Sequence, residues 1–168
     1  MNNGDRFFGK YRGQVISNID PMQIGRLLVQ VPDVSNVIPS TWAMPCFPVG
    51  GKQMGAWWLP QVGAGVWIEF EQGDPDYPIW TGCWFGSVAE MPSDLLAPPY
   101  KKVLLMTEGG HSIVLDDTPG IGGITLKTSG GQKIVMNATG IEIDNGMGAK
   151  LKMTGPQVSI NDGALDVI

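Results

Sequence analysis

Two pairs of acidic residues have spacings that acid–base or metal chemistry could use. Glu69 and Glu71 stand two positions apart in a β-type segment, so their side chains are expected on one face of a strand. A glycosidase needs two carboxyl groups about 5–9 Å apart, but a solvated strand face explains this pair more simply. Asp74 and Asp76 flank Pro75 and could bind Ca²⁺, although Ca²⁺ takes about six to eight oxygen ligands. A turn in which aspartate accepts hydrogen bonds from backbone N–H groups explains this second pair better.

No nucleophile or phosphate loop is complete in the chain. Gly110-His111-Ser112 resembles half of a GxSxG turn, but position 114 is valine and His111 is the only histidine. Asp116-Asp117 is read as another turn, and Gly120-Ile-Gly-Gly lacks the GK[ST] of a phosphate-binding loop. We therefore predict a non-enzymatic protein with no catalytic residue, no cofactor and no metal ligand.

Cysteines and tryptophans could also carry chemistry. Cys46 and Cys83 form no CxxC and are interpreted as buried small apolar residues rather than as a disulfide or metal pair. Tryptophans can stack on bases or sugars in OB barrels, but few basic residues surround them here, so burial in a barrel or against another subunit is preferred. The tryptophans in question are Trp57, Trp58, Trp67, Trp80 and Trp84.

Composition excludes several classes of protein. The 168 residues carry a net charge of −5 with a pI of about 4.7, which argues against a nucleic-acid partner. The N-terminal segment lacks the apolar core of a signal peptide. The longest uncharged run, residues 34–51, contains three prolines, which a transmembrane helix would rarely carry. We expect a protein that is made as a soluble chain without a signal peptide and is not sent through the general secretory route.

The distribution of aromatic residues divides the chain in two. All 14 aromatic residues lie at or before Tyr100, and residues 101–168 hold 12 of the 24 glycines. In the first part, strand-like segments at residues 25–31, 64–71 and 78–86 are separated by turns rich in proline and glycine. Short strands joined by turns over about 90 residues predict a small Greek-key barrel of the OB type.

The second part repeats a simple pattern. Seven apolar i, i+2 pairs recur every seven to eleven residues, each followed by turn residues. A lone ribbon of such strands would leave its apolar face wet and its edges open. We therefore predict an intertwined trimer in which each strand edge meets a neighbouring chain; a single-chain β-solenoid, which usually needs longer coils, is the alternative. The pairs are Ile113 and Leu115, Ile124 and Leu126, Ile134 and Met136, Ile141 and Ile143, Leu151 and Met153, Val158 and Ile160, and Leu165 and Val167.

The stretch "LPQVGAGVWIEFEQGDPDYPIWTGCWFG", residues 59–86, carries a family resemblance. It resembles the OB-fold signature of phage baseplate central-spike proteins (baseplate assembly protein V) and of the VgrG spikes of type VI secretion. The earlier "YRGQVISNIDPMQIGRLLVQVP" is similar to the opening hairpin of that family, and the repeats are similar to its triple-stranded β-helix needle. The signature positions are Pro60, Gly63, Gly73, Asp74, Pro75, Asp76, Pro78 and Gly82.

The resemblance implies an all-β chain with an N-terminal OB barrel and a C-terminal intertwined triple-stranded β-helix. Residues 1–90 would be the hub-docking barrel, 91–102 a linker and 103–168 the spike. The first six pairs would form the trimer core, and Leu165, Val167 and Ile168 would dock a small PAAR-like tip protein. The trimer would belong to a phage tail baseplate or equivalent injection particle, bind the hub protein at the tube end and puncture the target envelope.

Departures from the family and rival functions remain. Too few residues separate barrel and needle for a lysozyme domain, and one histidine cannot form a His-x-His metal tip. An OB module that binds oligosaccharide or single-stranded nucleic acid is the first alternative, and a cell-wall hydrolase the second. Neither alternative has a use for a rigid repeat needle.

Overall fold

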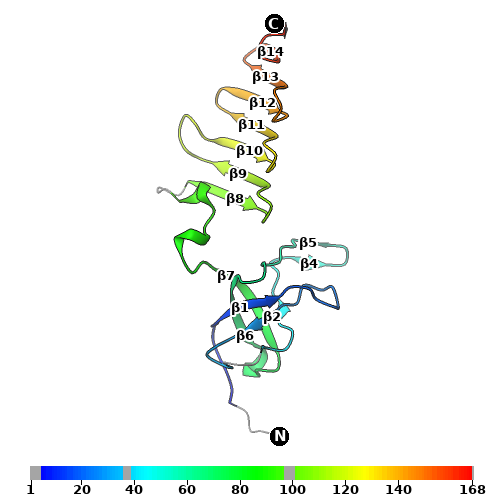
Figure 1. Ribbon diagram of the computed structural model, residues 1–168, viewed down its shortest axis with the longest axis vertical. Helices are drawn as coiled ribbons and strands as arrows, with labels where there is room; N and C mark the ends of the chain where they lie inside the picture. Colours follow the sequence, from blue (N-terminus) through cyan, green and yellow to red (C-terminus); the bar gives the residue numbers. More distant parts are fainter. Residues whose placement is uncertain (1–4, 36–38, 97–100, 168) are drawn as a thin grey trace. The chain divides into compact units, whose positions relative to one another are not determined.

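The computed structural model describes residues 5–35, 39–96 and 101–167, which form two compact units, residues 1–91 and 92–168 (Figure 1). Over those described ranges the chain is built from strands, with three short 3-10 helices at Glu71–Gly73, Val88–Glu90 and Ser93–Leu95. None of the helices in the described ranges is long and apolar enough to cross a membrane.

The first unit is the barrel. Its five-stranded sheet has the order β2-β1-β6-β7-β3, with β3 parallel to β7 and the other neighbours antiparallel. A bulge on β7 shifts the register between Trp67 and Ile68 of β6. Strands β4 and β5 form a separate hairpin that extends away from the sheet (Figure 1). The strands are β1 (Tyr11–Ser17), β2 (Leu28–Gln30), β3 (Met44–Pro45), β4 (Gly50–Gly51), β5 (Met54–Gly55), β6 (Gly65–Phe70) and β7 (Pro78–Trp84).

The apolar core of the described chain lies entirely in this barrel. Alternation along β1 and β2 directs every second residue inward, and β6 is buried along most of its length. Phe7, Tyr11 and Phe70 pack together at one side of the core with ring centroids 5.5–6.0 Å apart. The buried apolar residues are Val15, Leu27, Val29, Val31, Ala43, Val66, Ile68, Phe70 and Trp80.

A buried ion pair fixes the turn between β1 and β2. Asp20 Oδ1 accepts hydrogen bonds from Arg26 Nη2 at 2.7 Å and from Arg26 Nε at 3.0 Å. Backbone N–H groups of Met22, Ile24 and Arg26 donate to the same carboxylate. The Arg26 side chain, and then those N–H groups, hold the pKa of Asp20 well below its usual range against the opposing effect of burial. The Asp-Pro and Gly-Arg of the opening hairpin are therefore one hydrogen-bonded unit.

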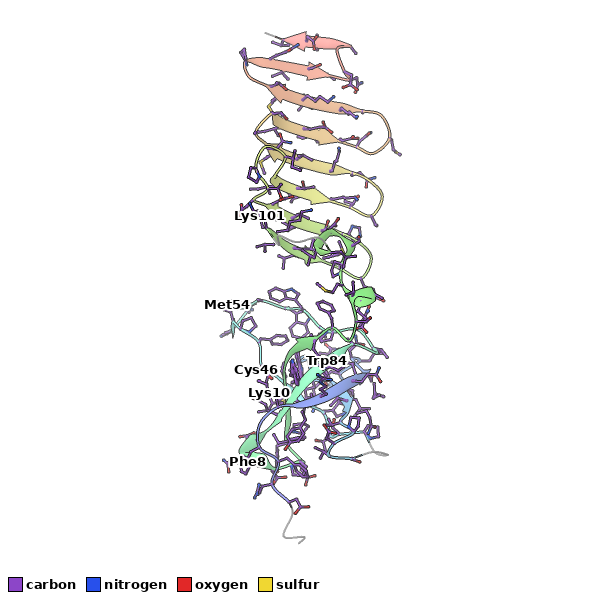
Figure 2. All side chains as sticks on the ribbon, turned by 90° about the vertical axis from the view of Figure 1, so that its left-hand side faces the viewer. Phe8, Lys10, Cys46, Met54, Trp84 and Lys101 are labelled. Carbon is purple, nitrogen blue, oxygen red and sulfur yellow. The ribbon has the colours of Figure 1, made fainter. Side chains whose placement is uncertain are left out.

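The signature turn has the predicted form, whereas the cysteines do not lie where they were expected. Asp74 Oδ1 accepts a hydrogen bond from the Asp76 N–H at 3.1 Å, which confirms the prediction of an aspartate turn. Pro78 is fully buried and begins β7. The prediction of buried cysteines was wrong: Cys46, labelled in Figure 2, and Cys83 are free thiols on exposed residues. Cys83 occupies an exposed position of β7 and Cys46 directly follows β3, and the apolar surroundings in sequence do not reveal either exposure.

The second unit is one antiparallel sheet of eight strands in chain order, from β8 to β15. Each strand pairs with the strands before and after it, so the hydrogen-bond ladder runs without a crossover. The strands are β8 (Lys102–Met106), β9 (Ser112–Asp116), β10 (Gly123–Lys127), β11 (Lys133–Asn137), β12 (Gly140–Asp144), β13 (Lys150–Thr154), β14 (Gln157–Ile160) and β15 (Leu165–Val167).

Two details of this sheet differ from the sequence-based expectation. There are eight strands instead of seven, because β8 adds the pair Val103 and Leu105. The adjacent Leu104 turns this pair into a continuous apolar run, which hides the alternation. The strand edges were also expected to meet neighbouring chains, yet β9 to β14 pair on both edges within their own chain. It is a face of the sheet, rather than its inner strand edges, that is left for partners.

We expect Asp20→Asn to lower the thermal midpoint of the barrel at pH 7 by about 4 °C or more, because it leaves Arg26 without its anion. All six tryptophans lie in the barrel unit, so their fluorescence follows this unit alone. Because folding lowers the pKa of Asp20, its carboxylate stabilises the folded barrel fully above the unfolded pKa, about 3.9. This stabilisation is lost as the pH falls through the folded pKa.

The difference in thermal midpoint between the unmodified chain and the Asp20→Asn protein should therefore stay constant from pH 7 to about pH 5 and shrink below about pH 4. Asp33→Asn, at an exposed position, is the control and should unfold like the unmodified chain. A difference in thermal midpoint that grows as the pH falls would contradict this account of the ion pair.

Candidate functional site

The eight-stranded sheet aligns its apolar pairs in two columns on one face, which we call the two-column face. Directly opposite partners in the ladder are always apolar on this face: Leu126 lies opposite Ile134, and Ile134 lies opposite Ile143. One column contains Val103, Leu115, Ile124, Met136, Ile141, Met153, Val158 and Val167. The other contains Leu105, Ile113, Leu126, Ile134, Ile143, Leu151, Ile160 and Leu165.

The two-column face is uncovered in the single chain. Across the described residues of the sheet unit no apolar side chain is buried, and thirteen of the column residues are 36–62% exposed. An uninterrupted apolar face of this size usually marks an interface in a soluble protein. A sheet with one apolar face buries that face against another layer, so we expect a partner layer on the two-column face.

The opposite face has different chemistry along its length. Its middle column begins with Leu104, Val114, Thr125 and Val135 and continues with Glu142, Lys152, Ser159 and Asp166. Ion pairs join neighbouring strands there: Lys133 Nζ lies 3.0 Å from Glu142 Oε1, and Lys150 Nζ lies 3.6 Å from Asp144 Oδ2. Charged residues interrupt this face, so it suits solvent.

The turns of the sheet are fixed by aspartates and by close backbone approaches. Asp116 accepts from the hydroxyl and the backbone N–H of Thr118, which together with Lys102 keep the pKa of Asp116 below its usual range. This confirms the turn predicted at Asp116-Asp117. The N–H of Gly146 has the same effect on the pKa of Asp144, with smaller contributions from Lys150 and Lys133. At Gly140 a Cβ atom would lie 2.0 Å from the Met153 carbonyl oxygen, so only glycine lets β12 begin beside β13.

The other candidate residues are dispersed. Glu69 lies 2.9 Å from Lys10 Nζ, while Glu71 belongs to a 3-10 helix after the end of β6, so the two do not share a strand. His111 Nδ1 accepts a hydrogen bond from the Ser129 N–H at 3.4 Å. In the described ranges, no group of three or more histidine, cysteine, aspartate or glutamate side chains could hold a metal ion. We therefore take the two-column face as the candidate functional site.

Two known domain families match the two parts of this chain. The family "Type VI secretion system/phage-baseplate injector OB domain" matches residues 11–85, and "Phage baseplate V C-terminal trimerisation domain" matches residues 102–166. A baseplate or type VI spike-type structural protein is the class that these two domains define together. The chain belongs to the phage baseplate V family, as the resemblance indicated, and the trimerisation domain supports a homotrimer.

Individual relatives agree with this assignment. VgrG5, a type VI secretion system spike protein of Pseudomonas aeruginosa, is 39% identical over 56 residues, which is 33% of this chain. VgrG1a, another spike protein of that organism, is 35% identical over 65 residues, or 39% of this chain. The matched parts span only 7% and 10% of those two relatives.

These findings confirm the predicted fold class: an all-β chain with an OB barrel followed by a C-terminal β-helix trimerisation domain. The sheet places all twelve residues predicted as trimer core in the two columns. Leu165 and Val167, predicted as tip-docking residues, are the last members of the columns, and Ile168 lies outside the described residues. Sequence reasoning missed Val103 and Leu105, the first members of the columns.

We expect Ile134→Asp to weaken trimer formation by at least about 100-fold, because it would bury three unpaired charges at one level of the interface. The matched control is Thr125→Asp, which places the same charge on the opposite face of the neighbouring strand. Native mass spectrometry and sedimentation should show monomers for the first variant and trimers for the second. A trimeric Ile134→Asp protein with unchanged thermal stability would contradict the inward assignment of the columns.

Proposed function

We propose that this chain is the central spike of a contractile injection machine and works as a rigid homotrimer without enzymatic activity. The observation that carries the proposal is the two-column face, whose apolar residues continue through all eight strands with no apolar side chain buried in the described part of the sheet unit. A sheet that exposes an apolar face along its whole length is suited to association with copies of itself through that face.

The dimensions of the sheet fit three copies. Strands of five residues are about 17 Å long, and eight strands at ~4.8 Å spacing form a ladder about 34 Å tall. Three such sheets arranged as a triangular prism would each lie about 5 Å from the axis. That is half of the ~10 Å that separates packed sheets, so one layer of side chains from each sheet would fill the prism. We propose the two columns as the trimer core.

Such a prism would resist load along its length. The hydrogen-bond ladder of each chain is continuous from β8 to β15, and compression along the prism acts on this ladder. Each sheet is supported from behind by the other two, so bending one sheet requires separation of an apolar interface. We propose that the trimer transmits the force of sheath contraction to the target envelope and punctures it.

The two ends of the chain would bind different partners. The barrel unit matches an injector OB domain, and we propose that it docks the hub protein at the end of the tube. At the other end, β15 pairs only with β14 among the described strands, and its Leu165 and Val167 are more than half exposed. An open edge beside apolar residues favours a covering protein. We propose a PAAR-like tip protein there.

The spike function is tested in assembled particles. We expect particles that carry Ile134→Asp to lack the spike and to lose target-cell killing or infection by at least about 100-fold, since the trimer cannot form. Particles with Thr125→Asp should retain both. Full activity of particles that contain monomeric Ile134→Asp protein would rule out a trimeric spike.

The tip is tested by truncation after Asp162, which removes β15 and keeps β14. We expect the truncated trimer to capture a PAAR-like protein at least about tenfold more weakly, because the apolar last level of the columns is lost. Capture by the complete trimer should depend little on salt. Asp166→Ser, which changes β15 on the opposite face, is the control and should capture normally. Undiminished capture after truncation would place the tip protein elsewhere.

A further inference from the structure

The barrel unit carries a second apolar surface, which neither the sheet interface nor the tip uses. It consists of loop 18–25, between β1 and β2, and of residues 54–60, from β5 onward. We call it the Trp57–Trp58 surface. Its six apolar side chains are 40–82% exposed: Ile19, Met22, Ile24, Met54, Trp57 and Trp58. Figure 2 shows Met54 on the hairpin that extends from the barrel.

Two contacts make the loop and the tryptophan segment one continuous surface. At the start of the loop, Asn18 Nδ2 donates a hydrogen bond to the Pro60 carbonyl oxygen at 3.0 Å. At the end of the loop, a Cβ atom on Gly25 would lie 2.9 Å from the Phe47 ring and 3.1 Å from the Trp57 ring. The glycine therefore lets the loop backbone lie directly against these rings.

The surface is rigid because both of its parts are anchored. Trp57 packs on Phe47 at 5.1 Å between ring centroids, and Phe47 meets the buried Trp80 edge-on at 5.4 Å. Trp80 Nε1 donates to the Gly25 carbonyl oxygen at 3.0 Å. The loop is held from inside by the carboxylate of Asp20. A surface fixed in this way loses little conformational entropy on binding, and tryptophans commonly dominate binding energy.

We propose that the Trp57–Trp58 surface binds the barrel of a second copy of this chain, the loop of one barrel packing on the tryptophans of the next. The proposal rests on the trimeric spike proposed above. A ring of three copies joins two different parts of each protomer, and the loop and the tryptophan segment provide the two parts. Contact between the barrels would add a second interface to the one that the two-column faces make in the trimer.

Tethering and charge favour this occupant. Seventeen residues, 85–101, connect β7 to β8 and can reach at most about 60 Å even when fully extended. A sheet trimer would therefore hold the three barrels at roughly millimolar effective concentration. Residues 18–25 and 47–60 contain two charged side chains, Asp20, which is paired with Arg26, and Lys52. Identical copies can approach through such a surface with little like-charge repulsion.

The test uses Trp58→Ser in the full-length chain and in full-length chain that also carries Ile134→Asp. Trp58 has no ring-stacking partner among the described aromatic pairs, so its replacement leaves the barrel core intact. In the trimer we expect Trp58→Ser to lower the fluorescence midpoint of barrel unfolding by about 4 °C or more; in the monomeric background the change should be under about 1 °C. Tyr77→Ser, at an exposed aromatic residue outside the surface, should act equally in both backgrounds.

Hydrogen exchange gives a second readout. Amides of residues 19–25 and 54–60 should exchange at least about tenfold more slowly in the trimer than in the Ile134→Asp monomer. Equal midpoint changes in both backgrounds, or unchanged exchange in a protein whose native mass is trimeric, would overturn this inference alone and assign the surface to a different protein. A chain that is monomeric by native mass would overturn both the inference and the proposed spike.

Discussion

The exposed apolar face of the eight-stranded sheet is the constraint on which the rest of this protein depends. Each strand offers two apolar side chains to the same face, and nothing in the described part of the chain covers them. The sheet can become dry only by association, so the oligomeric state and the structure of this unit are linked. The barrel differs in this respect, because its strands bury nine apolar residues within one chain.

This division explains why the two units carry such different sequences. The barrel closes its core within a single chain with aliphatic residues and two buried aromatic ones, Phe70 and Trp80, and further aromatic rings pack against it. The sheet uses medium-sized aliphatic residues, which the proposed prism, with about 5 Å between each sheet and the axis, would accommodate. Its opposite face carries charged residues, and ion pairs such as Lys133–Glu142 and Lys150–Asp144 join neighbouring strands there.

The fold class could be predicted from the sequence because both of its signals are local. The pairs from Ile113 to Val167 alternate with polar residues, and Asp74 and Asp76 mark a turn that depends on its own backbone. What could not be predicted depends on longer-range geometry. Leu104 conceals the alternation of β8. The exposure of Cys46 and Cys83 depends on which way the strands face. Whether the strands pair within one chain or between chains depends on how the turns close, at residues such as Gly140.

The chain-order pairing of β8 to β15 also has a kinetic consequence. Each strand from β9 to β15 pairs with the strand that was synthesised just before it, so the contacts of the sheet are local and loop closure costs little entropy. The ladder can form progressively, hairpin by hairpin, as the C-terminal part of the chain leaves the ribosome. Association of three preformed ladders is then a separate, concentration-dependent step. Between these steps the apolar face of the nascent sheet is uncovered, and in this interval the protein is most prone to aggregation.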